Sequence, residues 1–334
     1  MPRVTSLTSM SEKQLNRWIK RIALLFVVVL IFFVAFYAID RFRMPQAAIP
    51  DRQLAALEEA VRKDPGDVVS RGKLADTYLA KEMYQEAVAQ YSAIIDQGGN
   101  DVELAKFQRA RAYMATDQLD LAAKDYQAVV DIAKGGEMAN VDPMLGGAYY
   151  GLGDIAMRQG KTDEAIKHLE SALKIDKSDA DALLLIGKAY TAAGDTEKAG
   201  TALRHAVMFV PIGWAEPYQV MAEAYTKSGE TEMAEWANAM VDFVNGKTDQ
   251  GTARLTKLVD GKAALDANVG LGIIAETRGD LTGAREWYTK ALAIDPKNVS
   301  ATMGLGRVGG ASTPAPASPL PSLPEPGSST GGNG

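Results

Sequence analysis

Residues 180–213 read ADALLLIGKAYTAAGDTEKAGTALRHAVMFVPIG, and their pattern of residue types recurs along most of the chain. Apolar residues recur in it at spacings of three and four, as at Leu183, Ile186 and Tyr190. Such spacing places them on one face of a helix, because a helix completes a turn about every 3.6 residues. The stretch is therefore expected to be helical, with one face buried.

Small residues and turn residues divide the same stretch into two antiparallel helices. Gly187 and Ala199 leave room for the helices to approach closely, and Gly194 permits a tight turn between them. Pro211 ends the second helix, because proline has no backbone N–H to donate. One pair of helices cannot bury its own apolar face, so neighbouring pairs are expected to cover it.

The same pattern recurs along the chain. Each unit has an alanine followed four positions later by a larger residue, and these alanines are Ala87, Ala122, Ala165, Ala199, Ala234 and Ala284. Successive alanines are 35, 43, 34, 35 and 50 residues apart. A step of about 34 residues is the length of a helix-turn-helix repeat. The sequence thus predicts an all-α solenoid.

The repeats resemble those of the tetratricopeptide repeat family. The best unit matches the family pattern at Leu183, Ile186, Gly187, Tyr190, Gly194, Ala199, Leu203, Ala206 and Pro211. A unit from Gly146 and another over Leu265 to Asn298 match it nearly as well. The resemblance covers residues 51–308 in about six repeats, one of them irregular. It implies a solenoid in which the first helix of each unit lines a concave surface.

The array is expected to depart from regularity in four places. Asp51 to Asp64 is predicted to be a lone capping helix, and Val299 to Gly306 to begin a last helix. An insertion around Lys134 to Pro143 lengthens one step to 43 residues. The step of 50 residues contains an extra helix, Gln250 to Val259, so Glu232 to Asn245 is expected to serve two units.

An apolar run at Ile22–Ile39, IALLFVVVLIFFVAFYAI, is predicted to be a transmembrane helix. Its 18 residues include no charged one, and no amphipathic pattern suggests a buried core helix instead. Asp40 and Arg41 follow the run, whereas a cleaved signal peptide has small residues at this place. The run is also longer than the apolar core of a signal peptide. An uncleaved anchor is therefore favoured.

Positive charge around the run predicts its orientation. Five Lys or Arg residues precede it, and three lie in the 15 residues after it. Because cytoplasmic flanks carry the excess of Lys and Arg, residues 1–21 are expected inside the cell. After a linker at residues 40–50, the solenoid would then lie outside the cytoplasmic (inner) membrane of a bacterium.

The chain ends in a segment of different composition. Residues 309–334, GGASTPAPASPLPSLPEPGSSTGGNG, contain six of the 14 prolines. Such a segment buries too little apolar surface to fold, so a disordered tail is expected. Its PxxP spacings leave open a role as a docking peptide.

The composition limits the kinds of reaction and ligand that the chain can support. The chain has no cysteine and two histidines, His168 and His205, neither with a second histidine at a metal-ligand spacing. No phosphate-binding, serine-hydrolase or zinc-protease motif occurs. The net charge of -6 argues against a general nucleic-acid binder. We therefore expect no enzyme, no cofactor, no metal, no nucleic acid and no small-molecule substrate.

What remains is protein binding. The family resemblance implies exposed positions two, five, nine and twelve residues into each first helix. On this sequence they hold Phe107, Arg111, Met114, Tyr150, Asp154, Met157, Leu184, Lys188, Gln219 and Glu223. Apolar anchors mixed with both signs of charge suit a peptide segment.

These expectations combine into one functional hypothesis: a non-catalytic scaffold, anchored in the lipid bilayer through residues 22–39, that binds proteins or peptide segments. An anchor followed by LEEAVRKDPGD at residues 57–67 resembles the tetratricopeptide subunits of cytochrome c maturation. That resemblance implies a role in assembly or maturation of a membrane or exported complex. A fixed structural subunit of a large complex and a cytosol-facing receptor remain as alternatives.

Overall fold

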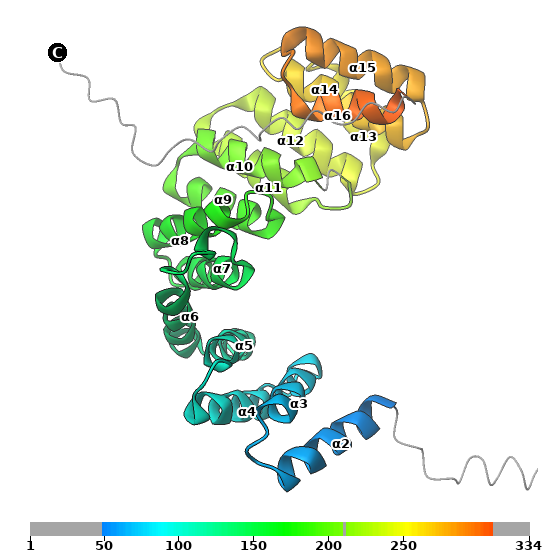
Figure 1. The fold of residues 1–334 in the computed structure, drawn as a ribbon. Coiled ribbons are helices and arrows are strands. Elements are labelled where there is room, and N and C mark those ends of the chain that lie inside the picture. The colour runs from blue at the N-terminus through cyan, green and yellow to red at the C-terminus, as the bar shows by residue number, and fades with distance from the viewer. Residues whose placement is uncertain (1–48, 210–211, 310–334) are drawn as a thin grey trace, which may run out of the picture. The chain divides into compact units, whose positions relative to one another are not determined.

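The computed structural model describes residues 49–209 and 212–309, and every regular element in those ranges is a helix. The elements are α2 (Ile49–Lys63), α3 (Val68–Ala80), α4 (Tyr84–Gln97), α5 (Val102–Ala115), α6 (Leu119–Ala133), the 3₁₀ turn η2 (Ala139–Val141), α7 (Pro143–Arg158), α8 (Thr162–Ile175), α9 (Ala180–Ala193), α10 (Thr196–Phe209), α11 (Glu216–Ser228), α12 (Thr231–Val244), α13 (Thr248–Thr256), α14 (Ala264–Thr277), α15 (Leu281–Ile294) and α16 (Val299–Val308). Figure 1 shows them in chain order.

The predicted anchor and tail lie outside the described residues. Neither Ile22–Ile39 nor the segment from residue 310 to 334 belongs to the described ranges, so both remain predictions. Within those ranges, no helix combines the length and the apolar character needed to cross a membrane.

The described helices divide into two compact units, with the boundary after Thr77, inside α3. In the first unit, α2 occupies the stretch predicted to be a lone capping helix. Asp67 caps the N-terminus of α3, because its carboxylate accepts hydrogen bonds from the backbone N–H groups of Val69 (3.0 Å) and Ser70 (3.1 Å).

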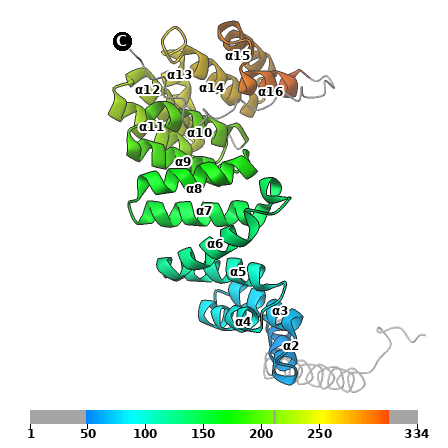
Figure 2. The same cartoon turned by 60° about the vertical axis from the view of Figure 1, so that its left-hand side comes forward.

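The second unit is built from antiparallel helix pairs. The pairs α5 with α6, α7 with α8, α9 with α10, α11 with α12 and α14 with α15 pack closely, and Figure 2 shows α7, α8 and α9 as successive layers. The predicted turn at Gly194 has φ of 79°, a left-handed conformation that glycine adopts without steric cost. Gly160, Gly229 and Gly279 end the first helices of other pairs in the same conformation. The tetratricopeptide-like solenoid is thus confirmed in this unit.

Glycines let large side chains fit between paired helices. A Cβ atom at Gly187 would lie 2.5 Å from the Leu203 side chain, as predicted for a close approach. Gly153 stands in the same relation to Leu169, with a separation of 2.6 Å. Such distances are far below van der Waals contact, so the spacing of each pair depends on the missing side chain.

The irregular region contains the predicted extra helix. α13 begins two residues before the predicted Gln250 and ends three residues before the predicted Val259. α12 packs on α11 before it and on α13 and α14 after it, as expected for a helix shared by two units. The Glu232 carboxylate at the start of α12 accepts hydrogen bonds from the backbone N–H groups of Lys262 and Ala263, which fixes the connection between α13 and α14.

The last helix, α16, occupies the predicted stretch from Val299 onward. The buried ring of Tyr288 lies between α14 and α16, where Cβ atoms at Gly272 and Gly304 would come within 2.5 and 2.4 Å of it. The Tyr288 hydroxyl donates to Glu276 at 2.8 Å, and Arg307 of α16 pairs with both oxygens of that carboxylate at 2.7 and 2.9 Å.

Candidate functional site

The ten predicted groove residues lie on four first helices. α5 carries Phe107, Arg111 and Met114, α7 carries Tyr150, Asp154 and Met157, α9 carries Leu184 and Lys188, and α11 carries Gln219 and Glu223. Successive first helices pack on one another, α5 on α7, α7 on α9 and α9 on α11. The predicted positions therefore form one band across neighbouring repeats rather than separate patches.

A polar cluster stands at the centre of this band. Burial, together with the nearby carboxylate of Asp154, raises the pKa of Tyr150 to about 12. The pKa of Tyr126, on α6, is also raised to about 12 by burial, while the Arg111 charge acts to lower it. Both Asp154 and Tyr150 act on Tyr126 as well. Arg111, Tyr150 and Asp154 are thus close enough to share one electrostatic environment.

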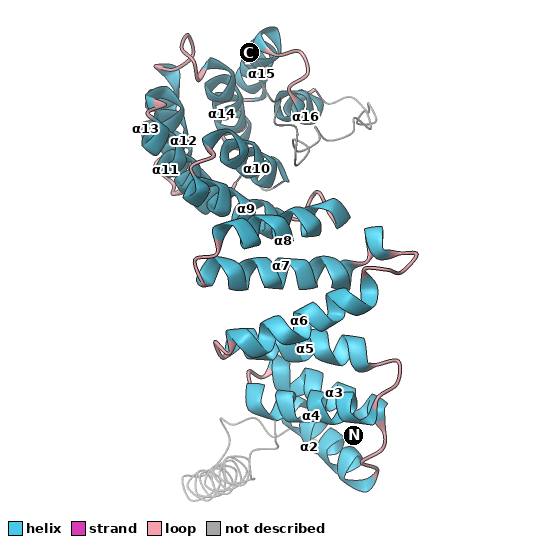
Figure 3. Cartoon of the chain, turned by 90° about the vertical axis from the view of Figure 1, so that its left-hand side faces the viewer, coloured by secondary structure: helices cyan, strands magenta, loops and turns pink. Residues whose placement is uncertain are grey.

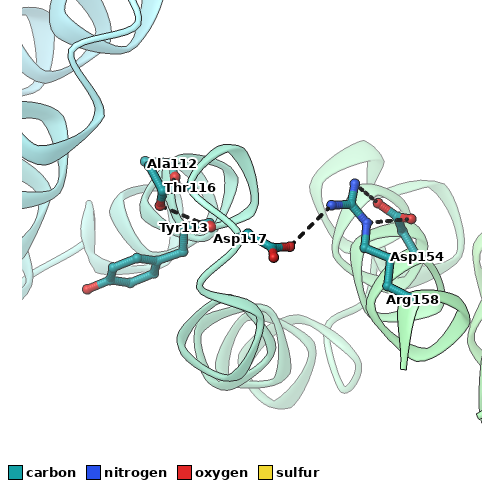
Figure 4. A network of polar contacts seen from close by, with 6 residues as sticks. All are labelled: Ala112, Tyr113, Thr116, Asp117, Asp154 and Arg158. Carbon is teal, nitrogen blue, oxygen red and sulfur yellow. Dashed lines mark hydrogen bonds and ion pairs between the residues drawn. The ribbon is translucent and has the colours of Figure 1, made fainter. Parts of the chain in front are cut away.

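The charged groups of this cluster are fixed by local contacts. Arg158 donates to Asp154 one turn earlier on α7, at 2.9 Å, and reaches Asp117 of the α5–α6 turn at 3.8 Å. Figure 4 shows the Arg158 guanidinium lying between these two carboxylates. The exposed Arg111 donates to Gln108 on its own helix at 2.8 Å. Only Asp154 among the acidic groups of this cluster was predicted.

Asp117 holds the α5–α6 turn in an unusual backbone conformation. Its φ of 57° is left-handed, as is that of Glu82 in the α3–α4 turn, whereas Gly160, Gly194, Gly229 and Gly279 take this conformation in later turns. The turn is closed by the Gln118 N–H, which donates to the Tyr113 carbonyl at 2.9 Å. Thr116 adds side-chain hydrogen bonds to the carbonyls of Ala112 (3.0 Å) and Tyr113 (3.2 Å), also drawn in Figure 4.

The apolar residues of the band are less available than predicted. Phe107 packs edge-on against Tyr126, with ring centroids 5.7 Å apart, and its ring occupies the space beside Gly147. Met114 and Met157 are partly buried against the core. The expectation that Leu184 is exposed is wrong, because its exposed fraction is 7%. Leu184 is a core residue and offers nothing to a partner.

Toward α11 the band consists of ion pairs. Lys188 contacts Glu216 at 2.6 Å, which ties α9 to the start of α11. Glu223 pairs with Lys227 one turn later, also at 2.6 Å. Gln219 is exposed between them. Exposed pairs of this kind contribute little to stability, so they can be exchanged for contacts to a partner at low cost.

The two histidines do not lie together. His168 is 3.9 Å from Glu164 and beside the Tyr149 ring, while His205 is buried on α10. Burial lowers the pKa of both imidazoles. Across the described ranges, no three His, Cys, Asp or Glu side chains are grouped so that they could hold a metal ion.

Three members of the central cluster, Asp117, Tyr126 and Arg158, were missed by the groove prediction. Asp117 belongs to the α5–α6 turn, which the family pattern does not place in the groove. Tyr126 belongs to a second helix, which the family pattern does not place in the groove. Arg158 follows Asp154 by four residues, so the helical i,i+4 spacing could have identified the pair. The surface of Arg111, Tyr150, Asp154 and Arg158 is called the central polar surface below. It offers phenol, carboxylate and guanidinium groups beside partly buried apolar side chains, and it suits a peptide.

Comparison with known proteins supports the repeat assignment. Two sequence profiles described as tetratricopeptide repeat match the chain, one over residues 156–211 and the other over residues 73–137 and 237–299. No match was found among the curated proteins.

Three solved structures illustrate the likeness. The C-terminal part of a repeat-containing protein from Cytophaga hutchinsonii is 18% identical, with 77% of this chain and 94% of that chain covered and a TM-score of 0.49. YrrB, described as having an unusual peptide-binding site, is 15% identical, with coverage of 61% and 98% and a TM-score of 0.48. MamA is 22% identical, with coverage of 53% and 97% and a TM-score of 0.46.

The repeat assignment rests on the profiles and on the geometry together. The matched ranges run from α3 to α6, across α8 to α10, and from α12 to α15, and they contain three of the close helix pairs described above, α5 with α6, α9 with α10 and α14 with α15. The helical array of this chain therefore belongs to the tetratricopeptide repeat family.

Proposed function

We propose that this protein is a non-catalytic scaffold, anchored in the cytoplasmic membrane through residues 22–39, whose repeats bind a protein partner at the outer face of that membrane. Tetratricopeptide arrays are typically protein-binding scaffolds and are generally not enzymes. Assembly or maturation of a membrane or exported complex is the role we propose for the bound partner.

One observation carries the binding part of the proposal. Arg111 of α5 and the Tyr150–Asp154 pair of α7 all act on Tyr126, although they come from different repeats. An extended segment crossing both helices would meet a cation, a phenol and a carboxylate in succession. Aromatic and arginine side chains are the residue types that contribute most at protein interfaces.

The amino-acid sequence supports the proposed membrane anchor. Ile22–Ile39 is long and apolar enough to span a bilayer, and the excess of positive residues before it favours a cytoplasmic N-terminus. An anchor so close to the repeats would hold them near the membrane surface, where they could retain a partner during its assembly.

Affinity purification tests the binding part. The full chain is extracted from membranes in mild detergent as wild type, Arg111→Ala, Tyr150→Ala and the control Lys167→Ala, which lies exposed on the second helix α8. We expect at least one co-purifying protein to be depleted about tenfold by the first two substitutions and unaffected by the control. If every co-purifying protein is recovered equally from all four, the central polar surface is not the binding site.

The same purification separates the proposal from a fixed structural role. A transient partner should dissociate as salt is raised, because exposed charge pairs are screened by ions. A protein that stays at constant ratio through high salt would indicate a permanent subunit of a complex instead.

A further inference from the structure

The irregular repeat creates two neighbouring clefts in the C-terminal half of the array. The first has a volume of about 90 Å³ and lies between α10, α12, α14 and α16, whose arrangement is visible in Figure 3. The second has a volume of about 690 Å³ and lies between α10, the start of α12 and the start of α14. Arg204 and Asp266 line both clefts, although they are far apart in the chain. We call the two together the C-terminal cleft.

The smaller cleft has both apolar and polar walls. Its apolar wall includes Val207, Trp236, Val269, Ile273 and Met303, and its polar residues include Arg204, Asp266 and Arg307. Its volume of about 90 Å³ is enough for a single aliphatic side chain, because a water molecule has a share of about 30 Å³. Met303 is 41% exposed, so the cleft is open at α16.

Asp266 presents a carboxylate without a partner at the junction of the two clefts. Its backbone carbonyl accepts a hydrogen bond from the Trp236 indole N–H at 3.0 Å, which fixes its position. Within the described part of the chain, however, no group donates a hydrogen bond to its carboxylate oxygens or forms an ion pair with them, and only the charge of Arg204 acts on them. Arg204 donates instead to the Tyr225 hydroxyl at 2.6 Å and forms no ion pair there. Arg307, the other arginine of the cleft, is already bound by both oxygens of Glu276.

Negative charge predominates around this carboxylate. The larger cleft is lined by Glu197, Glu230, Glu232 and Asp266, against the two cations Arg204 and Lys262. A buried or half-buried carboxylate in such surroundings is costly unless a cation approaches it. The Asp266 carboxylate is therefore suited to bind a cation. Because apolar side chains lie beside it, an aliphatic group on the same ligand would be buried there.

We propose that the C-terminal cleft binds an extended segment of a partner protein in which a Lys or Arg stands beside an aliphatic residue. The cation pairs with Asp266, and the aliphatic side chain enters the pocket next to Trp236 and Met303. This inference rests on the proposed scaffold function, but it uses other helices than the central polar surface. The chain's own tail is a poor occupant, because residues 310–334 contain no Lys or Arg.

Fluorescence anisotropy tests the proposal. The full chain is reconstituted in phosphatidylcholine nanodiscs and titrated against labelled ten-residue peptides in which Gly and Ser flank one of three cores. The cores are Lys-Leu-Lys-Leu, Glu-Leu-Glu-Leu and Lys-Ser-Lys-Ser. We expect the first to bind at least about tenfold more tightly than the other two.

Two substitutions locate the binding. Asp266→Asn and Met303→Gln are each expected to weaken binding of the Lys-Leu peptide about tenfold, while melting curves show both variants folded. Their matched controls, Asp163→Asn on the exposed side of α8 and Met138→Gln, a residue with 67% exposure, should bind as the wild type does.

Three results would overturn the inference. Equal affinity for the Lys and Glu peptides would show that the charge of the peptide does not contribute to binding. Unchanged affinity of Asp266→Asn would show that the peptide does not bind at this carboxylate. Binding that appears only after deletion of residues 310–334 would assign the cleft to the tail. Loss of binding in Tyr150→Ala alone would place the peptide on the central polar surface, which leaves the scaffold function intact and refutes this site.

Discussion

At the residue scale, one buried ion pair joins three helices of the array. Arg109 of α5 contacts both oxygens of Asp125 on α6, at 2.7 and 2.8 Å, and donates to Ser92 on α4 at 2.8 Å. The side chains are 18% and 5% exposed. A pair so shielded from water cannot lose one partner without leaving the other charge buried and uncompensated.

We predict that Asp125→Ala lowers the free energy of unfolding by about 3–5 kcal/mol, because Arg109 is left without its counter-ion. Asp131→Ala on the same helix removes an exposed pair with Lys134 and is expected to change stability little. Urea denaturation followed by circular dichroism measures both. Equal losses for the two variants would contradict the account of the Arg109 pair.

The carboxylate of Asp266 makes a second prediction at this scale. Burial raises its pKa above the model-compound value of 3.8, and the charge of Arg204 only partly opposes this. Because the folded pKa is the higher one, ionisation destabilises the fold, and stability is lost as the pH rises from about 3.8 through the folded pKa. The other charged and titratable groups that face the carboxylate or line its clefts are Tyr218, Tyr225, Glu197, Glu230, Glu232, Lys262 and Arg307.

Asp266→Asn is therefore expected to be at least as stable as the wild type near pH 4 and more stable, by about 1 kcal/mol, at pH 7. Urea midpoints at the two pH values measure the difference. A variant that is less stable at pH 7 would show that the carboxylate has a structural partner and is not held ready for a ligand.

At the element scale, the spacing of the paired helices depends on where each helix has a glycine. The sequence predicted the close approach at Gly187 and the turn at Gly194, because glycine at those places has a local physical reason. It also predicted the extra helix α13 and the double use of α12 from the length of one step. These features depend on spacing along the chain, which a single sequence displays directly.

The candidate site was less predictable, because exposure depends on neighbouring helices. Leu184 occupies a position that the family resemblance marks as exposed, yet it is buried among its neighbours in the core. Conversely, the Asp266 carboxylate lies at the C-terminal cleft only because α14 packs near α10 after the irregular repeat. No periodic pattern in the sequence indicates that juxtaposition.

Gly187→Ala is predicted to lower the free energy of unfolding by about 2 kcal/mol, because the new methyl group would lie 2.5 Å from the Leu203 side chain. Gly306→Ala is the control, since no atom lies within 4 Å of a Cβ atom there. That variant should be unchanged or slightly more stable, because alanine favours helix over glycine. Hydrogen exchange in α9 and α10 should report the loss locally, and equal stability of the two variants would count against the packing argument.

At the scale of the whole molecule, the proposed function depends on the predicted anchor and on the side of the membrane that the repeats would then occupy. The chain has no cysteine, so a single introduced thiol reports its own location. We predict that Lys167→Cys, on the exposed side of α8, reacts in intact cells with a maleimide that cannot cross the cytoplasmic membrane. Ser6→Cys should react only after the membrane is opened. The reverse pattern would indicate a cytosol-facing receptor.

The central claim is that the array holds a protein through the surface of α5 and α7. Its most direct test is site-specific photo-crosslinking in native membranes, with a benzoylphenylalanine at position 150 and, as control, at position 167 on α8. We predict a crosslinked protein from position 150, identified by mass spectrometry, that is absent from position 167 and lost with Arg111→Ala. The same products from both positions, or none from position 150, would contradict the claim.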